Sequence, residues 1–185
     1  MVVKLSLILL WLTLLVGAYS YSITYSATPG KRLPVSSRWP ENSGVQLSRE
    51  KKTLVLIIHP KCTCSRASLN ELLKILTHCP GKFKVYILAI IPSGLDKTWA
   101  KTDIVESACQ IKEAQVVYDF EGRLAHQFGA QTSGHVFVYR EDGRLLFDGG
   151  ITASRAHEGD NFGQFSIEEL GKNREKYSQT EVFGC

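Results

Sequence analysis

One run of side chains limits the folds open to this chain more than any other feature. Residues 53–58 (TLVLII) contain no polar side chain after the initial threonine. A strand that is apolar on both faces has to be covered on both faces, which is typical of parallel strands in α/β sheets. Leucines at helical spacing follow between residues 65 and 78, and residues 84–91 (KVYILAII) form a second run of the same kind. This alternation predicts an α/β domain that begins with parallel crossovers.

The remaining pattern continues the alternation and ends differently. An Asp-Gly pair at 142–143 lies between two apolar runs and predicts a hairpin turn. A capping box that starts at Ser166 predicts the start of a last helix there. The order βαβαβαββα follows, with a mixed sheet. The expected elements after residue 91 are a helix at 97–110, a strand at 115–118, a helix at 123–128, and strands at 135–140 and 144–147.

The N-terminal segment is the only long apolar run. No charged side chain occurs between Lys4 and Lys31, and residues 5–25 are long enough to cross a hydrocarbon core. A cleaved signal peptide would use residues 18–20 (AYS) as its cleavage site. We favour a retained anchor, because tyrosines 19, 21 and 25 suit a membrane interface. Residues 1–25 are therefore predicted to be an anchor or signal, with the rest of the chain on the extracytoplasmic (periplasmic) side, or secreted if the segment is cleaved.

In the rest of the chain, composition separates a linker from a domain and argues against a nucleic-acid partner. Residues 26–50 are rich in Pro, Ser and charge without an apolar period, which predicts a linker before a domain at 51–185. The net charge is only +4, and the basic residues are scattered. A nucleic-acid binder needs a concentrated basic face, so we expect no nucleic-acid partner.

The chemistry is concentrated in residues 59–68 (HPKCTCSRAS), between the first strand and the first helix. Ligand and reaction sites of open α/β sheets lie at the carboxyl ends of parallel strands. A thiol there faces a helix N-terminus, which stabilises thiolate, and Lys61 and Arg66 add positive charge. Cys62 and Cys64 are therefore the candidate catalytic pair, although closing so short a ring should strain a disulfide between them.

This arrangement resembles the thioredoxin-like proteins of the membrane-tethered TlpA/ResA kind, which carry Trp-Cys-x-x-Cys-Arg. Alignment on Arg66 places Cys62 at the nucleophilic position and Ser65 where the resolving cysteine would be. Cys64 falls between them, so the chain has a Cys-x-Cys variant of the motif. His59 ends the first strand next to Pro60, where we expect it either to support the site or to serve in packing or strand capping.

A second stretch lies where thioredoxins have a cis-proline beside the cysteines. Here the sequence is Thr-Ser-Gly-His, with Gly134 in the place of the proline, and Ser133 and His135 on either side. Residues 62–68 together with 149–161 (GGITASRAHEGDN) resemble bacterial RedB-type thioredoxin-like proteins over nearly the whole chain. That family does not supply a substrate.

The hairpin should bring residues 149–161 back to the cysteine end of the sheet. Arg155, His157, Asp160 and Asn161 make this segment dense in polar groups. It is predicted to act as a lid that orients a partner, or as a proton shuttle in which His157 tunes the thiols. The alternative is a polar loop that folds on itself through Asp and Asn turns.

The predicted function is thiol-disulfide exchange with a protein partner through Cys62 and Cys64, without a cofactor. One alternative is a copper carrier resembling Sco-type proteins, in which Cys62, Cys64 and His157 (or His135) bind Cu(I). Another is a redox-inactive adaptor. Cys79 and Cys109 are expected to be inert packing thiols, and Cys185 to be frayed at the chain end.

Overall fold

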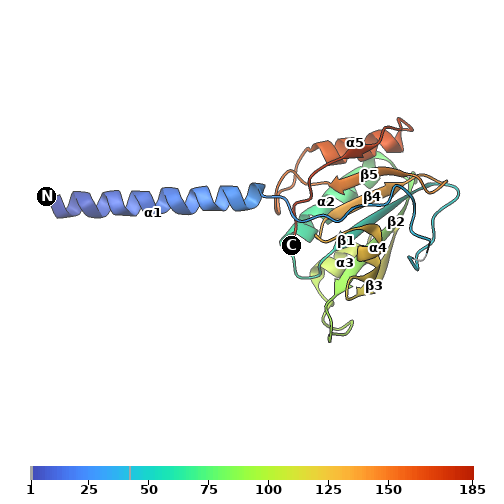
Figure 1. Cartoon of the computed structure of the whole chain (residues 1–185), viewed down its shortest axis with the longest axis horizontal. Coiled ribbons are helices and arrows are strands. Elements are labelled where there is room, and N and C mark those ends of the chain that lie inside the picture. Colours follow the sequence, from blue (N-terminus) through green and yellow to red (C-terminus); the bar gives the residue numbers. More distant parts are fainter. Residues whose placement is uncertain (1, 42) are drawn as a thin grey trace.

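The computed structural model describes residues 2–41 and 43–185. A single long helix, α1 (Val2–Ala27), projects from a compact α/β domain (Figure 1). Within the described residues it is the one helix long and apolar enough to cross a membrane, and none of it is buried against the domain. An anchor and a signal sequence both fit this helix.

A mixed sheet of six strands forms the centre of the domain, in the order β3-β2-β1-β4-β5-β6. β2 is parallel to β1 and β3 to β2, whereas β4 is antiparallel to β1, and β5 to β4. The short β6 pairs in parallel with β5. The strands are β1 (Lys52–Ile58), β2 (Phe83–Ile91), β3 (Ala114–Phe120), β4 (His135–Tyr139), β5 (Leu145–Gly150) and β6 (Ser178–Gln179).

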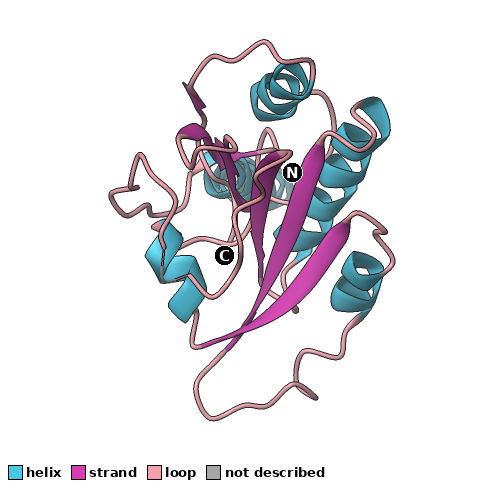
Figure 2. Cartoon of the chain, turned by 90° about the vertical axis from the view of Figure 1, so that its right-hand side faces the viewer, coloured by secondary structure: helices cyan, strands magenta, loops and turns pink. Residues whose placement is uncertain are grey.

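Helices cover both faces of the sheet (Figure 2). One face packs against α2 (Thr63–His78), α3 (Asp103–Cys109) and α5 (Phe162–Gly171). The other packs against α4 (Arg123–Phe128) and the chain before β1. Every residue of β1 is buried, because this strand is hydrogen-bonded on both edges and covered on both faces. The predicted α/β class and element order are confirmed.

Two helix boundaries differ from the sequence predictions. The helix expected at 97–110 begins only at Asp103, where the Thr102 side chain accepts a hydrogen bond from the Val105 N–H. The capping box at Ser166 was wrong as a helix start. Asn161 caps α5 instead, by accepting from the Gln164 N–H, and Ser166 lies buried inside the helix.

The segment predicted to be a linker, residues 26–50, lies along the domain. Arg32 forms a β-bridge with Ala130, and Arg38 forms another with Arg144. The ring of Trp39 packs edge-on against Phe128 and Tyr139, with centroids 5.1 Å away from each. This segment therefore covers one face of the sheet, as well as joining α1 to it.

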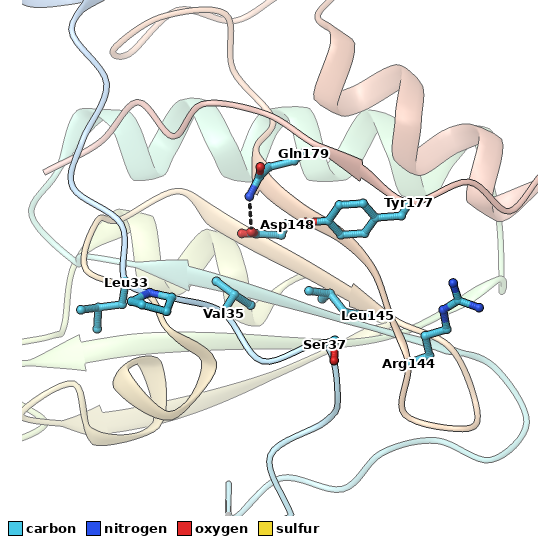
Figure 3. A pocket seen from close by; sticks show the side chains of 9 residues that line it. Leu33, Val35, Ser37, Arg144, Leu145, Asp148, Tyr177 and Gln179 are labelled. Atoms are coloured by element: carbon cyan, nitrogen blue, oxygen red, sulfur yellow. Dashed lines mark hydrogen bonds between the residues drawn. The ribbon is translucent and has the colours of Figure 1, made fainter.

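A buried ionic group holds the outer strands to this segment. His135 Nε2 lies 2.6 Å from an Asp148 carboxylate oxygen, and both side chains are almost fully buried. Arg32 pairs with the other oxygen at 2.7 Å. The Gln179 amide donates to that same oxygen (Figure 3). Burial opposes ionisation of Asp148, but these donors outweigh it and lower its pKa. Burial lowers the pKa of His135 despite Asp148, so neutral His135 donates its Nε2 proton to the carboxylate.

This group predicts loss of stability on mild acidification. A histidine with a lowered folded pKa stays neutral while the unfolded chain takes up a proton near pH 6.5, so the free energy of unfolding falls as the pH decreases through that value. Burial also lowers the pKa of His59, which adds to the same pH dependence. The contribution of His135 is therefore measured as the difference between the parent and a His135 variant. Urea unfolding at pH 7.5 and 5.5 should show a smaller decline for His135→Gln, by up to about 1.4 kcal/mol per pH unit. His126→Gln, at an exposed position, should decline like the parent, and an equal decline in all three proteins would contradict the assignment.

Candidate redox site

Cys62 lies at the N-cap of α2, four residues after the end of β1. The loop between them is tied at both ends. The His59 N–H donates to the Ser65 hydroxyl at 2.9 Å, and the Thr102 hydroxyl donates to the Pro60 carbonyl at 2.9 Å. The second bond holds the loop against the start of α3. These contacts fix Cys62 at the carboxyl end of the central strand, where the positive end of the α2 dipole is strongest.

Three sulfur atoms meet at this position. Cys62 forms a disulfide with Cys185, the last residue, with a Cα–Cα distance of 6.7 Å. Cys64 is a free, buried thiol in the first turn of α2. The three sulfurs lie within 4.8 Å of one another. The structure thus differs from two expectations: Cys185 is not frayed, and it, rather than Cys64, is the bonded partner of Cys62.

Backbone hydrogen bonds carry the C-terminal tail, residues 180–185, across the end of the sheet. Thr180 donates to the Asp148 carbonyl at 3.2 Å, and Gly150 donates to the Glu181 carbonyl at 3.2 Å. The Gly30 N–H donates to the Val182 carbonyl at 2.7 Å, and the Val182 side chain is fully buried. Because these bonds involve both strand β5 and the segment after α1, the tail is held along most of its length.

Ser133, predicted to support the site, contacts both cysteines of the disulfide, and Gly134 follows it at the end of β1. The Ser133 N–H donates to the Cys185 carbonyl at 2.9 Å, and the Ser133 hydroxyl accepts from the Cys185 N–H at 3.0 Å. The same hydroxyl is 3.6 Å from the Cys62 sulfur. Gly134 has a φ of +81° and donates its N–H to the Ile57 carbonyl at the end of β1. A side chain at 134 would also meet the Ser68 hydroxyl, so the position favours glycine.

The charged residues around Cys62 point outward. Lys61 Nζ lies 4.6 Å above the ring of Trp99, which also packs edge-on against the His59 ring. Burial, and then the charge of Lys61, lower the pKa of His59. Arg66 is exposed and pairs with Asp103 at 2.5 Å. Half of its side chain faces solvent, so its effect on the thiols is screened.

The loop at 149–161 returns to the cysteine end as expected, since Gly150 lies opposite His135 in the β4–β5 ladder. Of its predicted residues, Arg155 is beside the site. Its guanidinium donates to the carbonyls of Gly184 and Tyr25 and covers the Tyr25 ring at 4.8 Å. His157 is exposed, and its Nδ1 contacts the Arg155 carbonyl. It is not a member of the sulfur cluster.

The other two predicted residues of this loop have local contacts. Asn161 caps α5 and also donates to the carbonyls of Ile151 and Gly159. Asp160 is exposed. The loop is tied to α2 by the buried Glu71, which accepts from the Gly159 N–H at 2.7 Å. His135 contacts Asp148 and is not a member of the sulfur cluster. These contacts hold the loop in its conformation, and none of them involves Cys62.

The residue that sequence reasoning missed is Cys185. Its terminal position suggested fraying, but the preceding residues carry a signal. Val182 and Phe183 are an apolar pair in an otherwise polar tail, and the count of five cysteines left one thiol without a partner in any pairing. An apolar pair shortly before a cysteine indicates a tail that packs against the domain and holds the thiol in place.

Comparison with known proteins supports the fold and little more. No protein-family model matches the sequence, and no curated protein is significantly similar to it. A hypothetical protein from Sinorhizobium meliloti 1021 has 16% identity and a TM-score of 0.57, covering 86% of this chain and 93% of its own. An uncharacterized conserved protein from Geobacillus kaustophilus has 15% identity and a TM-score of 0.57, covering 86% of this chain and 90% of its own.

A secreted disulfide oxidoreductase from Mycobacterium tuberculosis is more distant, with 14% identity and a TM-score of 0.46, covering 69% of this chain and 84% of its own. Likeness at this level of identity shows the fold alone. Three parallel strands in the order β3-β2-β1, an antiparallel β4 on the other edge of β1, and a cysteine at the β1–α2 junction are the arrangement of the thioredoxin-like fold. The domain of this chain has that fold.

Proposed function

We propose that this chain is a membrane-anchored thiol-disulfide oxidoreductase that exchanges a disulfide with a protein partner, with Cys62 as the attacking thiol. The observation that carries the proposal is the sulfur cluster at the N-terminus of α2. Cys62 lies there beside Cys64 and Cys185, and it is already joined to one of them. Neighbouring thiols that can share one disulfide are what exchange requires.

Electrostatics supports Cys62 as the attacking group. Thiolate is the reactive species, and the free N–H groups at the start of a helix stabilise it. α2 has 16 residues and no acidic side chain in its first turn that would cancel this effect. The hydroxyl of Ser133, 3.6 Å from the Cys62 sulfur, is a further hydrogen-bond donor to a thiolate.

The proposed location is the extracytoplasmic side of a membrane. Helix α1 supports an anchor by its length and composition. The disulfide supports an oxidising compartment, because reducing systems keep most cytosolic thiols in the reduced form. The finer resemblance to RedB-type proteins stays a prediction.

The test is turnover of a protein disulfide by the full chain in detergent micelles. The reduced parent should accelerate insulin disulfide reduction by dithiothreitol, and Cys62→Ser should lose that acceleration by roughly 100-fold or more, because a hydroxyl cannot replace the attacking thiolate. Cys109→Ser removes an exposed free thiol outside the cluster and should keep parental activity. A parent that does not exceed the uncatalysed rate would favour the redox-inactive adaptor.

A second candidate function, Cu(I) carriage, is supported by the same cluster with a changed ligand set. Soft thiolates prefer Cu(I), and three sulfurs within 4.8 Å can surround one ion after the disulfide is reduced. The third ligand in this version of the proposal is Cys185 in place of His157, whose Nδ1 contacts the Arg155 carbonyl.

Retention of Cu(I) against the chelator bicinchoninate checks this candidate. The reduced parent and His157→Ala should retain about one ion per chain, whereas Cys62→Ser and Cys185→Ser should release it, because two-sulfur sites hold the ion less firmly. Equal release from the parent and from Cys62→Ser would remove copper carriage from consideration.

A further inference from the structure

The geometry points to Cys185 as the thiol that resolves the mixed disulfide on Cys62, with the tail 180–185 occupying the partner's place in the oxidised protein. This inference rests on the proposed exchange function and names its second catalytic residue. It assigns to Cys64 the role of a bystander in the main reaction.

The pairing of Cys62 is the first observation. Of two thiols within 4.8 Å, Cys62 is joined to the one 123 residues away, not to the one two residues away. Cys64 is committed to the first turn of α2, where the Ser65 N–H donates to the Cys62 carbonyl at 3.0 Å. A Cys62–Cys64 bond would have to close a very short ring within that turn, whereas the tail brings Cys185 to a Cα–Cα distance in the normal range of disulfides.

The second observation is the seat of the tail, the set of contacts from Ser133 and Arg155 that hold Gly184 and Cys185. Ser133 holds Cys185 by both its backbone N–H and its hydroxyl, next to the Cys62 sulfur. Gly184 passes so close to the Ser133 carbonyl that a Cβ at 184 would lie 1.8 Å from the oxygen. The Arg155 guanidinium donates to the Gly184 carbonyl. Together these contacts position Cys185 beside the Cys62 sulfur.

The covering of Cys62 is the third observation. Cys62 is only 3% exposed while the tail is seated, so a partner sulfur reaches it only after the tail moves. The seat on Ser133 pairs with the backbone of an extended segment, and a partner that brings its cysteine to Cys62 has to use the same space. The tail therefore competes with the partner before attack and replaces it afterwards.

The exchange balances in atoms and electrons. Cys62 thiolate attacks one sulfur of the partner's disulfide, forming a Cys62–partner bond, and the partner's other sulfur leaves as thiolate. Cys185 thiolate then attacks the Cys62 sulfur, the Cys62–partner bond breaks, and the partner's second sulfur leaves as thiolate. The chain has lost two electrons to the partner, both thiol protons have passed to solvent, and the Cys62–Cys185 disulfide remains. With a dithiol protein as the partner, the same steps run in reverse.

The test follows both steps with dithiodipyridine, a small aromatic disulfide that releases one coloured pyridinethione at attack and a second at resolution. The reduced full chain is used in micelles with the exposed Cys109 replaced by Ser in every variant. Cys185→Ser should release the first equivalent and stall as a Cys62 adduct visible by mass spectrometry, with resolution slowed by at least about tenfold, because the positioned thiol is lost. Cys64→Ser should resolve like the parent.

Gly184→Ala separates positioning from a general loss of structure. This variant keeps the Cys185 thiol, but its methyl group cannot fit against the Ser133 carbonyl. The first release should become faster, since Cys62 is uncovered, and the second should become slower by roughly tenfold. Glu181→Gln, an exposed position in the same tail, should leave both phases unchanged. Opposite changes in the two phases would not follow from unfolding alone.

Two results would overturn the assignment. One is an adduct that accumulates in Cys64→Ser while Cys185→Ser resolves at the parental rate. The other is Gly184→Ala with parental kinetics in both phases. Failure of the proposed function looks different: in that case Cys62→Ser would release pyridinethione with the same two phases as the parent.

Discussion

Burial of β1 on both faces is the constraint on which the rest of this structure depends. Its seven residues are buried, and β2 and β4 pair with its two edges. A strand in this position needs helices on one face and a second layer on the other, which α2, α4 and the segment before β1 supply. The hydrogen-bonded ladders with β2 and β4 set the register of the strand, so the point where it ends is also fixed. Cys62 inherits its position from that end, four residues later, at the start of α2.

The remaining parts of the site come from distant segments that the same sheet end brings together. Gly134 bonds to the carbonyl of Ile57, so the loop before β4 meets the end of β1. The tail reaches this point by following β5, and Arg155 joins its Gly184 carbonyl to that of Tyr25 in α1. The C-terminus consequently lies at the end of the domain from which α1 departs (Figure 1). An anchor that crosses a membrane would hold the sulfur cluster at the membrane-facing end of the domain.

Local patterns predicted the elements well because they are dominated by burial. The apolar runs of β1 and β2 and the leucine spacing of α2 each report which faces are covered, and this information is present within a few residues. The start of α5 was misplaced because the sequence offers two caps. Ser166 has the capping-box pattern, but Asn161 lies before it and accepts the hydrogen bond from the Gln164 N–H that begins the helix. The two-residue β6 has too few side chains to show a period, and its pairing with β5 comes from the tail's tertiary contacts.

The residues of the site also differ in whether local sequence features can place them. Cys62 could be placed from the sequence because a strand end and a helix start locate it, both of which are local features. Cys185 could not, because it lies 123 positions after Cys62 and the two sulfurs meet only once the segment between them has folded. This dependence has a consequence for the chemistry. Only a folded domain with a seated tail holds Cys185 at Cys62. In the proposed exchange, the seating of the tail would therefore decide whether Cys185 can resolve the mixed disulfide, and the close approach of the Gly184 and Ser133 backbones supports that seating.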